Sequence, residues 1–120
     1  MIDIMLFRHS ETENFSAGQI IFKQGESGST MYVISEGEVS ILVGATVVEV
    51  AGPGTIVGEM ALIDLGPRSA TAVAKTDCKL VPIDQRRFEF MVQQTPFFSL
   101  TVMKIMADRL RRTDARLASS

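Results

Sequence analysis

The chain has 120 residues, of which 46% are hydrophobic and 22% charged, values that suit one ordinary globular domain. The formal net charge of −2 argues against sequence-independent binding to DNA or RNA, because that binding needs a basic surface to displace counterions from phosphates. Cys78 and His9 are each the sole residue of their type, which excludes an internal disulfide and any metal site built from several thiolates.

From about residue 11 to 84 the sequence alternates short β-type runs with turns. The runs are rich in β-branched and aromatic residues and fall at 20–22, 31–34, 39–43, 46–50, 69–73 and 79–83. Glycine-containing turn segments separate the first four runs. Many short strands at near-regular spacing are typical of a jelly-roll sandwich or barrel and not of a parallel sheet.

The remaining residues predict two helices. Asp84 can cap a helix over about 85–94, in which Phe88, Met91 and Val92 recur at helical spacing. Thr95-Pro96 ends that helix and begins another over about 96–117, since proline suits the first helical turn.

The second predicted helix has apolar residues on two faces. Phe98, Val102 and Ile105 form a cluster that we expect to pack on the β-strands. A separate seam alternates by three and four, as in a coiled coil, and consists of Met103, Met106, Leu110, Thr113 and Leu117. The seam predicts a homodimer through the 96–117 helix; the alternative is one broad core face on a monomer.

The segment 58–71 combines residue types that suit a phosphorylated sugar. Gly58 and Glu59 open a predicted short helical turn, whose first backbone N–H groups are free to bind an anion. Arg68 can form a bidentate, charge-assisted pair with a phosphate, Ser69 adds a hydroxyl, and the Glu59 carboxylate can accept from a ribose hydroxyl. In the alternative interpretation Glu59 and Arg68 pair with each other and Gly58 only serves a turn.

This segment resembles the phosphate-binding cassette of cyclic nucleotide-binding domains. That pattern reads Gly-Glu, an apolar residue, Ala or Gly, Leu, a short loop, then Arg with Ser, Thr or Ala, and Ala; residues 58–62 and 68–70 fill it. The spacing from Glu59 to Arg68, including Pro67 directly before the arginine, resembles that in regulatory subunits of the cAMP-dependent protein kinase. Residues 68–114 resemble bacterial catabolite activator protein in a run without a gap, and the whole resemblance covers roughly 12–117.

The resemblance implies one cyclic nucleotide-binding domain over residues 1–120. Its expected fold is mainly β with α: a jelly-roll β-barrel with a short N-terminal helix, a short helix in the cassette and two C-terminal helices. By the same resemblance Arg68 would bind the exocyclic oxygens of the cyclic phosphate, and Glu59 would accept from the ribose 2′-hydroxyl. The rest of the cradle would come from Gly58, Met60, Ala61 and Ser69.

The resemblance also implies contacts to the base. Ile41 and Val48 are expected as apolar walls for the purine. Thr113 and Asp114 stand where the activator protein has a Thr-Ser pair that reaches the adenine amino group, and Asp114 departs from that pair. The implied ligand is cAMP, with cGMP as the alternative, and no other cofactor is expected.

We therefore expect a sensor that signals when its two C-terminal helices close over the bound ligand, read by an unidentified protein partner, and not an enzyme. No apolar run approaches a membrane span and residues 1–4 lack a signal-peptide pattern, so we expect a cytoplasmic protein without membrane binding. The resemblance implies a stand-alone bacterial member of the family, and the net charge argues against direct nucleic-acid binding. The alternatives are the ligand-binding part of a larger regulator or channel, and a nucleotide-independent interaction domain of the same fold.

Overall fold

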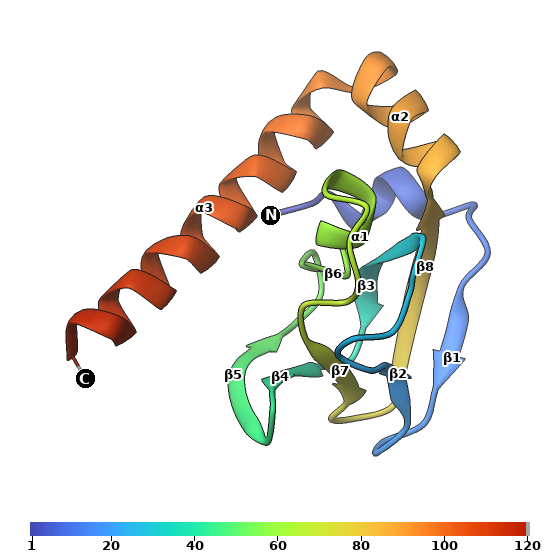
Figure 1. Ribbon diagram of the computed structural model, residues 1–120. Coiled ribbons are helices and arrows are strands. Elements are labelled where there is room, and N and C mark those ends of the chain that lie inside the picture. Colours follow the sequence, from blue (N-terminus) through green and yellow to red (C-terminus); the bar gives the residue numbers. More distant parts are fainter. Residues whose placement is uncertain (120) are drawn as a thin grey trace.

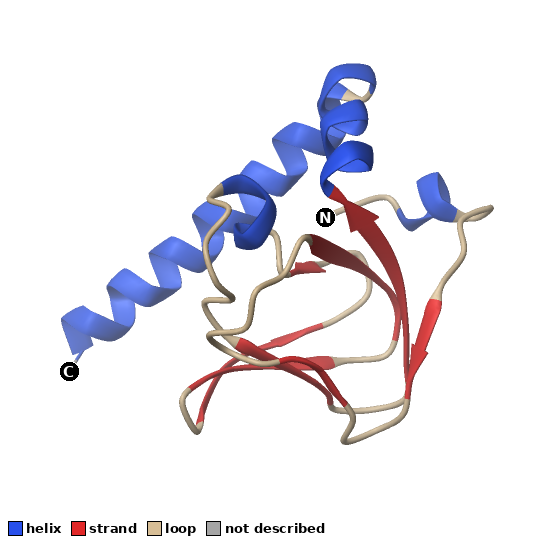
Figure 2. Ribbon diagram, turned by 45° about the vertical axis from the view of Figure 1, so that its right-hand side comes forward, coloured by secondary structure: helices blue, strands red, loops and turns tan. Residues whose placement is uncertain are grey.

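Two antiparallel sheets and a group of helices at one end of them make up the computed structural model, which describes the backbone of residues 1–119 and the side chains of residues 1–113 (Figures 1 and 2). One sheet has the strand order β1-β8-β3-β6 and the other β2-β7-β4-β5. The strands are β1 (Glu13–Phe15), β2 (Ile20–Phe22), β3 (Thr30–Glu36), β4 (Val39–Val43), β5 (Thr46–Ala51), β6 (Ile56–Val57), β7 (Thr71–Ala74) and β8 (Cys78–Asp84). The helices are the 3-10 turn η1 (Ile4–Phe7), α1 (Met60–Ile63), α2 (Gln85–Gln94) and α3 (Pro96–Ser119).

The jelly-roll character of the fold is confirmed, but a closed barrel is not. Within the described part of the chain no strand pairing joins the two sheets, so they form an open sandwich. The edge strands explain the opening: β2 has three residues and β6 two, and each gives way to a glycine-containing loop before it could pair across. β6 and the three-residue strand β1 also lie outside the predicted strand runs.

Both faces of the central β3–β8 pair are buried. Alternate residues of a strand point to opposite faces. Ile34 and Leu80 therefore pack between the sheets, whereas Met31, Val81 and Ile83 pack against the helices. The result is two apolar layers, of which the second fixes the helices on the sheet.

α2 and the first half of α3 are anchored by caps and by aromatic packing. The Asp84 carboxylate accepts a hydrogen bond from the Arg87 backbone N–H at 2.8 Å, which caps α2 as predicted. Phe98 is 2% exposed and meets the rings of Phe7 and Phe88 edge to face, with centroids 6.5 and 6.1 Å apart. With its start held in this way, α3 runs past α1 toward β5 (Figure 1).

The predicted seam on α3 lies largely in solvent along its described part. Met103 and Leu110 are exposed, and Met106 packs partly against the core. Leu117 lies outside the described side chains, and the homodimer stays a prediction. Among the described residues, no helix combines the length and the apolar character that a membrane crossing requires.

Candidate functional site

Gly58 occupies a position that only glycine fits without strain. Its φ of +80° lies in the left-handed region. A Cβ there would lie 2.6 Å from Nη1 of Arg68 and 3.2 Å from the backbone oxygen of Thr30. The missing side chain lets the Arg68 guanidinium approach, and its Nη1–H donates to the Gly58 carbonyl at 3.1 Å.

Arg68 is a buried cation with unused hydrogen-bonding capacity. The residue is 7% exposed, and its guanidinium lies over the Phe22 ring, 4.1 Å from the centroid. Its Nε is buried and makes no hydrogen bond to any described residue. Burial lowers the pKa of Arg68, and the charges of Tyr32, Glu26 and Glu59 oppose that shift. Since an arginine stays protonated in proteins, this buried charge favours an anionic ligand.

Glu59 lies just before α1, and it does not form the ion pair with Arg68 that the alternative interpretation of the sequence expected. Instead of pairing with Arg68, its Oε1 accepts from Nη1 of Arg109 on α3 at 2.7 Å. The Glu59 side chain is 7% exposed, and its other oxygen makes none of the described hydrogen bonds. A buried carboxylate with one oxygen engaged can accept a hydrogen bond from a ligand hydroxyl.

Arg109 of α3 donates hydrogen bonds to β5, to β6 and to the residue before α1. Its Nε and Nη2 donate to the two oxygens of Glu49 on β5, at 2.8 and 3.1 Å, and Nη2 also donates to the Ile56 carbonyl. Arg112, one turn further along α3, lies 3.4 Å from Glu49 Oε1. Burial acts to lower the pKa of Arg109, but the hydrogen bonds and charges of Glu49 and Glu59 outweigh it and raise the pKa above its ordinary value.

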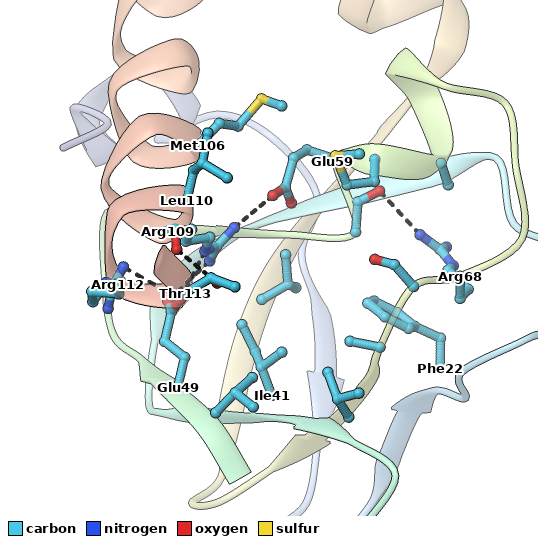
Figure 3. A pocket seen from close by; sticks show the side chains of 18 of the residues that line it. Phe22, Ile41, Glu49, Glu59, Arg68, Met106, Arg109, Leu110, Arg112 and Thr113 are labelled. Atoms are coloured by element: carbon cyan, nitrogen blue, oxygen red, sulfur yellow. Dashed lines mark hydrogen bonds and ion pairs between the residues drawn. The ribbon is translucent and has the colours of Figure 1, made fainter. Parts of the chain in front are cut away.

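These groups surround a cavity of about 760 Å³, a size typical of small-molecule sites. Figure 3 shows Arg68 and Arg109 on opposite sides of it, with Glu59 between them. Every predicted binding residue with a described side chain lines the cavity, namely Ile41, Val48, Gly58, Glu59, Met60, Ala61, Arg68, Ser69 and Thr113. The side chain of Asp114 lies outside the described residues.

Some lining residues escaped the sequence prediction: Phe22, Glu49, Arg109 and Arg112. Helical spacing could have indicated Arg109, because it precedes the predicted site residue Thr113 by one turn, and the Thr113 hydroxyl donates to the Arg109 carbonyl at 3.0 Å. No comparable signal marks Glu49 or Phe22, since each is one residue of an ordinary strand.

The comparison with protein families agrees with this geometry. The family described as "Cyclic nucleotide-binding domain" matches residues 12–95. The CRP-like cAMP-activated global transcriptional regulator of Mycobacterium tuberculosis (strain ATCC 25618 / H37Rv) is 30% identical over 118 residues, which cover 94% of this chain and 53% of that protein.

Solved structures extend the likeness to the fold. The catabolite activator protein of Thermus thermophilus superposes with a TM-score of 0.80 at 28% identity, over 95% of this chain and 56% of that one. The EAL enzyme Bd1971 matches in its cAMP-bound form, with a TM-score of 0.66 at 31% identity over 90% of this chain and 30% of that one. Its cGMP-bound form gives 0.68 at 29% identity, over 91% and 30%. The chain spans about half the length of the two regulators.

Proposed function

The chain belongs to the cyclic nucleotide-binding domain family, and from this premise we propose that it binds cAMP in the cavity beneath α3 and acts as a regulatory sensor. The observation that carries the proposal is Arg68, a buried cation with an unpartnered Nε beside an apolar cavity. A cyclic phosphate would supply an anion that accepts hydrogen bonds from this guanidinium. The Gly58 turn and Phe22 hold the guanidinium in place before any ligand arrives.

The rest of the cavity suits the sugar and the base. The free oxygen of Glu59 accepts from the ribose 2′-hydroxyl, while its other oxygen stays on Arg109. Ile41 on one side and Leu110 of α3 on the other provide apolar surfaces for a purine. Val48 also lines the cavity and adds to this apolar surface. cAMP is favoured because the Mycobacterium tuberculosis relative is named as cAMP-activated. cGMP is the second candidate, since Bd1971 has both a cAMP-bound and a cGMP-bound form.

Signalling would follow from the position of α3. Its residues Arg109, Leu110 and Thr113 line the cavity, so a bound nucleotide has contacts that exist only when α3 lies over it. A ligand with that differential affinity shifts the population toward the closed arrangement of α2 and α3. An unidentified protein, or a second copy bound through α3, would read the altered surface. The proposed role is binding and not catalysis, and it applies equally if this sensor works within a larger regulator.

Isothermal titration with cAMP, cGMP and non-cyclic AMP tests the proposal on wild type, Arg68→Ala and Arg68→Lys. Hydrogen bonds to charged groups are worth about 1.5–3 kcal/mol each, so Arg68→Ala should weaken cAMP binding roughly tenfold to a hundredfold. Arg68→Lys keeps the charge but not the planar fork, and should lie between. Arg86→Ala, which removes an exposed arginine on α2, is the matched control and should bind as wild type does.

Two results would overturn the proposal. If wild type gave neither heat nor a thermal shift with any cyclic nucleotide, the domain would be a nucleotide-independent interaction module. If Arg68→Ala bound cAMP as tightly as wild type, the phosphate would lie elsewhere.

A further inference from the structure

Arg109 divides its donors unequally between the buried carboxylate of Glu59 and the largely buried carboxylate of Glu49. Its Nε and Nη2, one edge of the guanidinium, engage both oxygens of Glu49, whereas Nη1 alone reaches Glu59. The side chains of Glu49, Glu59 and Arg109 are 11%, 7% and 18% exposed, so water has little access to the hydrogen bonds between them.

We propose that Glu49 is a positioning residue, which holds Arg109 so that Glu59 keeps one oxygen for the ribose 2′-hydroxyl; this inference rests on the proposed function. A guanidinium presents its donors as a planar, rigid fork. Glu49 takes the Nε–H and one N–H of Nη2, and the Ile56 carbonyl takes the other N–H of Nη2, so that Nη1 alone is left to donate to Glu59. The Ile56 carbonyl, which also accepts from Nη2, holds the same orientation.

Loss of Glu49 would change how Arg109 meets Glu59. Bidentate arginine–carboxylate pairs are the strong ones, so a guanidinium released from Glu49 would turn its paired donors onto Glu59. Both oxygens of Glu59 would then be engaged, and the ribose hydroxyl would lose its acceptor. Glu49 does not touch the hydroxyl itself in this arrangement; it acts through Arg109.

Because charged side chains line the cavity, a test of Glu49 must separate loss of the ribose contact from a general change in phosphate affinity. Three arginines, Arg68, Arg109 and Arg112, and two glutamates line it, which leaves one excess positive charge for the singly charged cyclic phosphate. Any change at Glu49 removes a negative charge and so strengthens phosphate binding in general. The ratio of affinities for cAMP and 2′-deoxy-cAMP cancels this effect, because the two ligands carry the same phosphate and base and differ only in the hydroxyl.

The experiment measures that ratio by isothermal titration for wild type, Glu49→Ala and Glu49→Gln. Wild type should prefer cAMP by about tenfold or more, the value of one hydrogen bond to a charged group. Glu49→Ala should reduce the preference to less than about threefold, and Glu49→Gln, which keeps one acceptor for Arg109, should fall between. Glu36→Ala removes an exposed carboxylate of β3 that lies 4.0 Å from Lys79, and should keep the wild-type ratio.

The outcomes separate the two proposals. If wild type binds neither nucleotide, the proposed function fails. If wild type prefers cAMP and both Glu49 variants keep that preference, the positioning role is overturned, because a merely structural or electrostatic role would change the affinities for both ligands by the same factor. Thermal unfolding of each variant shows that it is folded, and Glu49→Gln decides the matter if Glu49→Ala does not fold.

Discussion

Replacement of Arg109 by methionine should destabilise the protein even without a ligand. The substitution keeps an unbranched apolar stem but leaves Glu49 and Glu59 buried without their shared cation. Removal of one partner of a buried ion pair costs about 3–5 kcal/mol. Arg112 remains 3.4 Å from Glu49 and partly compensates that charge. Because of this neighbour and the residual exposure of the group, we expect a loss of about 2–4 kcal/mol in the free energy of unfolding.

Urea denaturation followed by circular dichroism measures this loss. Arg111→Met is the matched control on the same helix: its side chain is 80% exposed and lies 3.7 Å from Asp108, and its loss should stay within about 0.5 kcal/mol. A second change, Glu59→Gln in the Arg109→Met background, should restore part of the stability because it removes one uncompensated charge. If Arg109→Met and Arg111→Met unfold at the same urea concentration with equal slopes, the network does not hold α3 on the sheets.

Three further predictions concern the arginine pocket, the core and the cysteine. Gly28→Ala should weaken cAMP binding about tenfold or more in a titration, because its Cβ would lie 2.3 Å from Nε of Arg68 and displace the guanidinium; unchanged binding would mean that Arg68 does not need its present position. Phe98→Ala should cost about 3–5 kcal/mol in urea denaturation, whereas Phe97→Ala, at a position 82% exposed, should cost far less; equal losses would contradict the packing of α3. Burial raises the pKa of the Cys78 thiol, so its contribution to stability is present below the pKa of the unfolded chain and lost as the pH rises through the folded pKa. Iodoacetamide at pH 8 should therefore modify the native thiol much more slowly than the urea-unfolded one, and equal rates would show that the thiol is accessible.

Local signals were sufficient to predict most of the helices and strands. Asp84 and Pro96 mark the starts of α2 and α3 because capping and proline geometry depend on a few neighbouring residues. Closure of the barrel depends instead on whether edge strands from distant segments reach one another. The two-residue strand β6 and its break at Gly58 prevented that, and no run of the sequence shows it.

The binding site, like the fold, was only partly predictable from the sequence. The pattern around Arg68 identified the cassette because Glu59 and Arg68 lie on one short segment with a recognisable spacing. Helical spacing could indicate Arg109 as a site residue but not as the partner of Glu59. Arg109 lies 50 residues later and reaches Glu59 only because Phe98 and its neighbours direct α3 across the cavity. Glu49, 60 residues before Arg109, depends on the same placement of the helix.

A crystal structure of the protein grown with saturating cAMP tests the central claim most directly. We predict nucleotide in the cavity beneath α3, with phosphate oxygens roughly 2.7–3.2 Å from the Arg68 guanidinium and the ribose 2′-hydroxyl at a similar distance from Glu59. An empty cavity at saturating cAMP, or a nucleotide whose phosphate contacts other residues, would contradict the assignment of this site.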